Sequence, residues 1–310
     1  MSGERTPTAV DVFDTTLRDG AQFEGISLTV DDKLRVAEQL DWLGVRWIEG
    51  GYPQANPRDA EFFARAAAGD LRLETATLVA FGSTRKPLGK VDVDPTLAAL
   101  VQAGCTTSCI VGKSWDFHVI EALRTTLDEG VAMVGDSVRF LRAEGQRVFF
   151  DAEHFFDGYK ANPEFALRVL EAAATEGAEV LVLCDTNGGS LPHEVERIVG
   201  EVAAYFGPDQ QIGIHTQNDT GCAVGNTVAA VVAGASHIQG TVNGYGERTG
   251  NANLMTVIPD LQLKMGITCL PEGRIDRLTA VSRHVAELVN LPPHAADPYV
   301  GSSAFAHKGG

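Results

Sequence analysis

The strongest constraint on the fold of this chain is a regular alternation of short apolar runs with amphipathic stretches of helical length. Eight runs have the length and apolar or β-branched character of buried strands, at residues 10–14, 47–50, 74–79, 108–111, 147–151, 180–184, 212–215 and 237–241. A helix between consecutive strands implies parallel pairing, because the helix returns the chain to the edge where the previous strand began. Eight such units predict a closed (β/α)8 barrel, a TIM barrel, in the α/β class.

The same alternation places most of the chain in one barrel domain, which we expect to cover residues 1–268. The eighth helix pattern, at residues 253–265, is followed by a Leu-Pro-Glu-Gly turn and a further helix pattern at residues 275–289. Prolines and small residues then end the alternation. We therefore expect residues 269–310 to form a short C-terminal extension, helical at first and then extended.

Charge and cysteine usage exclude several classes of protein. The 41 acidic and 25 basic side chains give a formal net charge of −16, which repels phosphate backbones and argues against nucleic-acid binding. No apolar run approaches the roughly 20 residues of a membrane span, and the first residues lack the layout of a secretion signal. The 5 cysteines are scattered, as is typical of reduced thiols in a cytoplasmic protein.

Polar side chains gather where most of the predicted strands end. A TIM barrel carries its functional site at the C-terminal ends of its strands, so these groups predict a functional rim. They follow the first, second, fifth, sixth, seventh and eighth strands, and include Asp19, Glu49, Glu153, Asp185, His215 and Glu247.

Three of the rim residues suit a divalent metal. His215 and Gln217 lie two apart at the end of a strand, so their side chains point the same way. With Asp19 they offer one nitrogen and two oxygens, a set that can hold a metal and leave it open to substrate. Asn251 can add an oxygen directly or through water. The alternative is that His215 and Gln217 only form hydrogen bonds in a polar barrel mouth.

Arg18 and Glu153 are the candidate catalytic residues. At the end of the first strand, the Arg18 guanidinium can hold a substrate carboxylate or stabilise an oxyanion. The alternative for Arg18 is a buried ion pair that closes the bottom of the barrel. Glu153 can serve as a general base, and the alternative is a surface-loop carboxylate.

Thr186 and His118 are candidates for substrate binding, together with Arg18. The Thr186 hydroxyl can bind a substrate carboxylate, or it can cap the helix that follows. His118 follows a Ser-Trp-Asp-Phe run and can reach into the barrel mouth, although a purely structural histidine fits the same position.

Four motifs resemble those of a known family. The run DTTLRDGAQ at residues 14–22 resembles the signature of the DRE-type TIM-barrel metal-dependent acyl-CoA condensing enzymes and lyases. The run GTVNGYGERTGNAN at residues 240–253 resembles the second signature of the isopropylmalate, homocitrate and citramalate synthase branch. Within that branch, DAEHFFDGYK at residues 151–160 and LCDTNGG at residues 183–189 are most similar to the citramalate synthases.

This resemblance implies a reaction, its cofactor and its substrates. An acyltransferase of this kind condenses acetyl-CoA with pyruvate on a divalent metal (Mg²⁺, Mn²⁺ or Zn²⁺) and hydrolyses the thioester, giving citramalate and CoA for isoleucine biosynthesis. Acetyl-CoA is a co-substrate, and a homodimer is expected. The alternatives are a sister synthase of the 2-isopropylmalate or homocitrate type, or a catalytically impaired barrel that binds metal and 2-keto acid.

The resemblance also assigns roles to individual residues. Asp19 and His215 match metal ligands, and Asn251 matches an accessory ligand. Arg18 matches the arginine at the substrate carbonyl, and Glu153 matches the carboxylate near the acetyl group. Thr186, in turn, matches the hydroxyl near the keto-acid carboxylate.

Two departures from the family pattern stand out. Gln217 occupies the place of a second histidine, and its amide oxygen favours Mg²⁺ or Mn²⁺ over Zn²⁺. Family members also continue past the barrel into a linker subdomain and a regulatory domain. We therefore expect residues 269–310 to be the start of a linker subdomain that is otherwise absent, and we expect no feedback inhibition through the usual regulatory domain.

Overall fold

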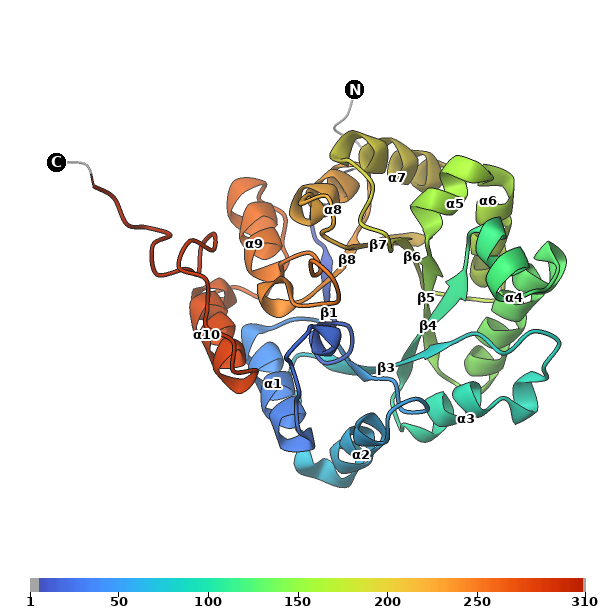
Figure 1. The fold of residues 1–310 in the computed structure, drawn as a ribbon, viewed down its shortest axis with the longest axis horizontal. Coiled ribbons are helices and arrows are strands. Elements are labelled where there is room, and N and C mark those ends of the chain that lie inside the picture. Colours follow the sequence, from blue (N-terminus) through green and yellow to red (C-terminus); the bar gives the residue numbers. More distant parts are fainter. Residues whose placement is uncertain (1–5, 309–310) are drawn as a thin grey trace.

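Eight parallel strands close into a barrel in chain order, and β8 pairs with β1 (Figure 1). The structure is a computed structural model that describes residues 6–308, so the predicted domain limits at residues 1 and 310 lie outside its described part. The strands are β1 (Asp11–Asp14), β2 (Trp47–Gly51), β3 (Thr77–Ser83), β4 (Thr107–Lys113), β5 (Arg147–Glu153), β6 (Val180–Asp185), β7 (Gln211–Thr216) and β8 (His237–Gly240). The predicted TIM barrel is confirmed.

The third strand lies further along the chain than its apolar run indicates. It is predicted at residues 74–79, whereas β3 spans Thr77–Ser83. The reason is Asp41, a buried carboxylate that accepts hydrogen bonds from three consecutive backbone N–H groups. They are those of Glu74 (3.0 Å), Thr75 (2.8 Å) and Ala76 (2.7 Å). With their donors bound to Asp41, these residues lie outside the sheet.

Helices surround the barrel and cover the outer face of its strands (Figure 1). They are α1 (Val30–Leu43), α2 (Pro57–Arg65), α3 (Pro95–Gln102), α4 (Leu127–Ala143), α5 (Phe155–Ala161), α6 (Pro163–Thr175), α7 (Pro192–Phe206), α8 (Ala223–Val232), α9 (Leu254–Pro259) and α10 (Leu278–Leu288). A capping box opens α1, where Thr29 and Asp32 satisfy each other's backbone donors. Gly44, with a φ of 95°, ends this helix.

The extension after the barrel contains the predicted helix, whereas its later part, predicted to be extended, forms a series of turns up to residue 308. In Figure 1 its helix α10 lies against α1, and Arg277 stacks 4.6 Å from the ring centre of Trp42. Ser282 of α10 donates a 2.6 Å hydrogen bond to Asn243, which follows β8. That residues 269–310 begin a linker subdomain stays a prediction. Across residues 6–308, no helix is both long and apolar enough to cross a membrane.

The barrel interior changes from apolar to polar along the strands. A buried apolar cluster separate from the helix–strand core fills it, and includes Phe13, Trp47, Val79, Phe149, Val180 and Val182. Two residues beyond Trp47, Phe149 and His237, the inward face carries Glu49, Asp151 and Gln239 instead. The polar rim thus rests on a packed apolar floor.

His237 lies in this floor as a neutral imidazole. Its ring stands 5.3 Å from that of Phe13 and 5.4 Å from that of Phe149, centroid to centroid. Neither ring nitrogen has a hydrogen-bond partner among the described residues. Burial lowers the pKa of His237 to about 3, with a smaller contribution from Arg46.

We expect His237 to make the stability of the fold depend on pH. Below about pH 6.5 the unfolded chain binds a proton at this position and the folded chain does not, so the free energy of unfolding falls as the pH drops from about 6.5 toward 3. His237→Leu removes this contribution. Between pH 7 and pH 5 the original protein should lose about 2 kcal/mol more than the variant, measured by urea unfolding. Equal losses in the two proteins would contradict the assignment.

Candidate functional site

Asp19, His215 and Gln217 meet in the mouth of the barrel. The turn after β1 delivers Asp19, and the end of β7 delivers His215 and Gln217. Asp19 Oδ2 lies 3.3 Å from His215 Nε2 and 3.1 Å from Gln217 Nε2. All three side chains are buried. The convergence that the sequence predicts is therefore present, between the first strand and the seventh.

Two amide oxygens at this cluster have no partner within the described part of the chain, and the Gln217 amide turns its nitrogen toward Asp19 and His215. Gln217 Oε1 and Asn251 Oδ1 are both buried and accept no hydrogen bond from any residue in the described range. Asn251 Nδ2 donates to the backbone oxygen of Tyr245 at 3.0 Å, which orients the amide. An orphaned buried oxygen costs free energy unless something binds it. One imidazole, one carboxylate and two amide oxygens form a donor set that suits a divalent cation.

The loop after β8 holds Asn251 in place through glycines. Gly246 and Gly250 have φ values of +157° and +92°, a backbone region that disfavours other residues. Asn251 N donates to Gly244 O at 3.0 Å, and Asn218 N donates to Gly250 O at 2.8 Å. The second bond ties this loop to the end of β7.

The electrostatics of the cluster favour a bound cation. Burial alone would raise the pKa of Asp19, but Arg18 and the hydrogen bonds from His215 and Asn251 outweigh it and hold that pKa well below its usual range. Burial would lower the pKa of His215, yet the Asp19 carboxylate raises it. An ionised carboxylate therefore faces a ring nitrogen that binds either a proton or a metal.

Arg18 forms a buried ion pair, but at the top of the barrel. Its Nε lies 2.6 Å from Glu49 Oε2, and its Nη1 lies 3.4 Å from Asp19 Oδ1. Thr15 donates a 2.5 Å hydrogen bond to the same Glu49 oxygen. The ring of Phe81 lies 3.9 Å below the guanidinium. The alternative that Arg18 closes the barrel bottom is wrong, because its partners lie at the C-terminal ends of the strands.

A second buried group, Glu49 with Cys109 and Asp151, has ligand-type atoms within 4.8 Å of one another. Burial raises the pKa of the Cys109 thiol well above its ordinary value, so the sulfur keeps its proton and is a poor metal ligand. Arg18 already provides a positive charge beside Glu49. This group is therefore better described as the anionic support of Arg18 than as a metal site.

Glu153 ends β5, and its side chain is partly buried at 26% exposure. It forms an ion pair with Lys113, the last residue of β4. Side chains alternate along a strand, so Glu153 shares the inward face with Asp151. The alternative of a surface-loop carboxylate is wrong, because Glu153 belongs to a barrel strand.

Thr186 and His118 lie on the same side of the mouth, joined through His154. Thr186 Oγ1 accepts a 2.8 Å hydrogen bond from the backbone N–H of His154, which has a φ of +56°. Thr186 does not cap the next helix, because α7 begins at Pro192. The His118 ring packs at a tilt against Trp115 and edge-to-face against His154, with ring centres 4.8 and 4.4 Å apart. No hydrogen bond or ion pair within residues 6–308 joins Thr186 or His118 to the Asp19 cluster.

The sequence alone assigns no role to four residues around the site. They are Glu49, which pairs with Arg18; Lys113, which pairs with Glu153; and the buried pair Gln239 and Asp151, behind His215. Three of them are polar residues inside otherwise apolar strands. That is a usable signal, because a buried polar side chain needs a partner.

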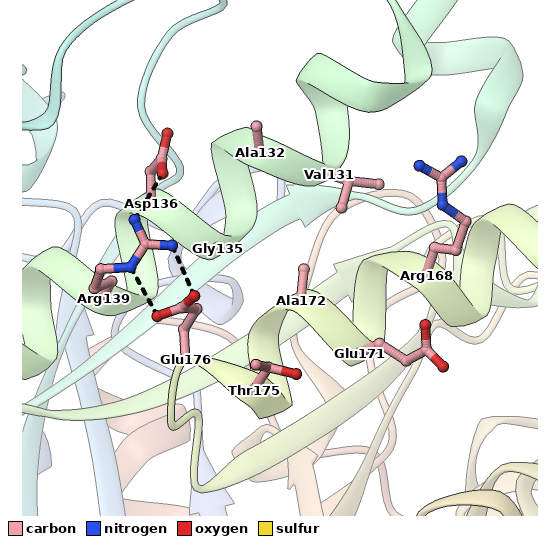
Figure 2. A pocket seen from close by; sticks show the side chains of 10 residues that line it. All are labelled: Val131, Ala132, Gly135, Asp136, Arg139, Arg168, Glu171, Ala172, Thr175 and Glu176. Carbon is pink, nitrogen blue, oxygen red and sulfur yellow. Dashed lines mark hydrogen bonds and ion pairs between the residues drawn. The ribbon is translucent and has the colours of Figure 1, made fainter.

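The surface also carries a hollow between α4 and α6, on the outside of the barrel. Figure 2 shows Arg139 reaching from α4 toward Asp136 and Glu176, at 3.1 and 2.7 Å. These ion pairs are exposed to solvent, and the three charged groups already have one another as partners. The hollow holds none of the convergent buried groups of the barrel mouth.

Comparison with known proteins gives one family and several close relatives. The model of the HMGL-like family matches residues 9–286. An (R)-citramalate synthase from Streptomyces coelicolor is 58% identical over 96% of this chain and 55% of its own length. A 2-isopropylmalate synthase from Sulfolobus acidocaldarius is 35% identical over 97% of this chain and 74% of its own. The chain spans little more than half the length of the citramalate synthases it matches.

The fold has close neighbours among solved structures. A hydroxymethylglutaryl-CoA lyase from Pseudomonas aeruginosa superposes with a TM-score of 0.78 at 18% identity, covering 99% of both chains. At this identity the likeness concerns the barrel alone.

Proposed function

Because the chain belongs to the HMGL-like family, we propose that its barrel condenses acetyl-CoA with pyruvate and releases citramalate and CoA. The observation that carries the proposal is the convergence of Asp19, His215 and Gln217 beside the buried guanidinium of Arg18. High identity to several proteins named (R)-citramalate synthase supports pyruvate as the keto acid. The reaction would turn the acyl group into an alkyl group on transfer.

Four residues would hold a divalent ion. Asp19 and His215 would supply a carboxylate oxygen and Nε2, and Gln217 and Asn251 would supply their orphaned amide oxygens. When bound, such an ion polarises a keto-acid carbonyl as a Lewis acid. Its identity belongs to this proposal, as Gln217 favours Mg²⁺ or Mn²⁺.

The other residues divide the work on the two substrates. Glu153 would take a proton from the acetyl methyl group, which then forms the carbon–carbon bond to the keto carbon. Arg18, held between Glu49 and Asp19, would stabilise the negative charge that develops on the keto oxygen. Thr186 would donate its hydroxyl hydrogen to the keto-acid carboxylate, since its oxygen already accepts from His154. Water would then cleave the thioester and release CoA as a thiol.

Thiol release from acetyl-CoA tests this function directly. With Mg²⁺ or Mn²⁺ present, we expect release with pyruvate at least about tenfold faster than with 2-ketoisovalerate or 2-oxoglutarate. A preference for 2-ketoisovalerate would instead indicate a 2-isopropylmalate synthase, and a preference for 2-oxoglutarate a homocitrate synthase. No release with any keto acid, alongside intact metal binding, would indicate a binding-only barrel. The homodimer stays a prediction.

Gln217→His should change the metal that the site prefers. An imidazole in place of an amide oxygen suits Zn²⁺ better, so we expect the ratio of Zn²⁺ to Mg²⁺ affinity to rise by about tenfold or more. Competition titration of the purified protein measures this ratio. Gln211→His, the same change at the opposite end of β7, is the matched control and should leave the ratio unaltered. An unchanged ratio in Gln217→His would remove Gln217 from the ligand set.

A further inference from the structure

We propose that Gln239 and Asp151 are positioning residues that hold the His215 ring with its Nδ1–H on Gln239 and its Nε2 facing the cation site. Neither residue touches the cluster of Asp19 and Gln217 in the contacts among residues 6–308, so both would act through His215. The inference rests on the metal site of the proposed function. It adds two residues, Gln239 and Asp151, that orient His215 before an ion binds.

A chain of two hydrogen bonds joins three strands inside the barrel. His215 Nδ1 lies 2.8 Å from Gln239 Oε1, and Gln239 Nε2 donates to Asp151 Oδ1 at 2.9 Å. His215 and Gln239 are register partners on β7 and β8, and Asp151 belongs to β5. The side chains are almost fully buried, with exposures of 6%, 0% and 3% for His215, Gln239 and Asp151.

Which atom donates in each of these two hydrogen bonds follows from the chemistry of the groups. Gln239 turns its NH₂ toward Asp151 Oδ1, 2.9 Å away, and its Oε1 toward His215 Nδ1, 2.8 Å away. An amide oxygen only accepts, so His215 Nδ1 carries the hydrogen. Nε2 is then the ring nitrogen that faces Asp19 Oδ2, 3.3 Å away, and the one that can exchange its proton for a cation.

Filling the barrel does not by itself require this polar chain. The floor just below is apolar, and Phe13, Phe149 and Val182 are fully buried there. Burying an amide and a carboxylate costs free energy that apolar side chains avoid. The polar pair lies beside His215, where fixing a ligand tautomer typically changes metal affinity by about 10- to 100-fold.

Two variants of Gln239 separate positioning from packing. Gln239→Leu keeps a similar volume but cannot accept from Nδ1. Gln239→Glu, protonated between Asp151 and His215, would still accept from Nδ1 with one oxygen and donate with the other. His237→Leu, two residues earlier on β8 and without hydrogen bonds to the ligands, is the matched control.

The first readout is the affinity for Mn²⁺ alone, measured by titration calorimetry without substrates. We expect about a 10- to 100-fold loss for Gln239→Leu and values within about threefold of the original for Gln239→Glu and His237→Leu. The second is the presence of a hydrogen on His215 Nδ1 in the metal-free protein, from ¹⁵N chemical shifts. The original protein and Gln239→Glu should carry this hydrogen, and Gln239→Leu should not.

Unchanged affinity in Gln239→Leu, or the absence of a hydrogen on Nδ1 in the original protein, would overturn the inference. Equal losses in Gln239→Leu and Gln239→Glu would also overturn it, because they would indicate packing. Failure of the proposed function is a separate result, since neither readout needs turnover. A chain that binds Mn²⁺ as expected but releases no thiol keeps this inference and loses the proposed reaction.

Discussion

Asp19→Asn should lower pyruvate-dependent thiol release by about 10³-fold and weaken Mn²⁺ binding in parallel. The asparagine keeps the shape of the side chain but removes the anionic oxygen that lies against His215 Nε2 and Gln217 Nε2. A Lewis acid contributes several kcal/mol of charge stabilisation, and each 1.4 kcal/mol is about tenfold in rate. Steady-state kinetics and calorimetry on the same preparations measure both losses.

The matched control is Asp128→Asn, the same change at a carboxylate that is 86% exposed and pairs with Arg168 on the outside of the barrel. We expect it to alter neither quantity by more than about twofold. If Asp19→Asn retained the Mn²⁺ affinity of the original protein, Asp19 would not be a ligand, whatever happened to turnover.

Arg18→Met should have the second largest effect, on stability as well as activity. Arg18 is the cation beside a completely buried Glu49, and it also lies next to Asp19. Removing one partner of a buried ion pair leaves an uncompensated charge and typically costs about 3–5 kcal/mol. Turnover should fall with it, because no other guanidinium contacts Asp19 in the described chain.

A double variant distinguishes the lost ion pair from lost packing. Arg18→Met combined with Glu49→Leu removes both charges, so we expect urea unfolding to recover most of the stability while thiol release stays lost. Arg168→Met, which breaks the exposed pair with Asp128, should cost no more than about 1 kcal/mol. A loss in Arg18→Met as small as that of Arg168→Met would mean that the pair with Glu49 is not desolvated.

Much of the fold can be predicted from signals between residues that are close together in the sequence. The α1 helix begins at a capping box and ends at Gly44, and both signals depend on residues within one turn of each other. The third strand is different, because Asp41 draws the backbone of Glu74–Ala76 out of the sheet from more than thirty residues away. The sequence around residues 74–79 therefore does not predict the contact with Asp41.

The site residues likewise fall into those that the sequence predicts and those that only the folded structure identifies. Asp19, His215 and Gln217 could be predicted because a barrel sends all strand ends to one face, and residues two apart on a strand share a direction. Their partners could not. Which acceptor faces His215 Nδ1, or which carboxylate pairs with Arg18, depends on side chains from other strands. Polar residues within apolar strands identify the candidates, and only the assembled barrel pairs them.

Asp19, His215 and Gln217 lie on either side of the β8–β1 pairing that closes the barrel. Asp19 and Gln217 are 198 positions apart along the chain, and the strand between theirs, β8, is the last to be made and pairs with β1. A nascent or partly folded chain that lacks this closure cannot assemble the donor set. Binding of a divalent ion should therefore stabilise the pairing between β8 and β1. Removal of the ion by a chelator should weaken this pairing before the rest of the barrel.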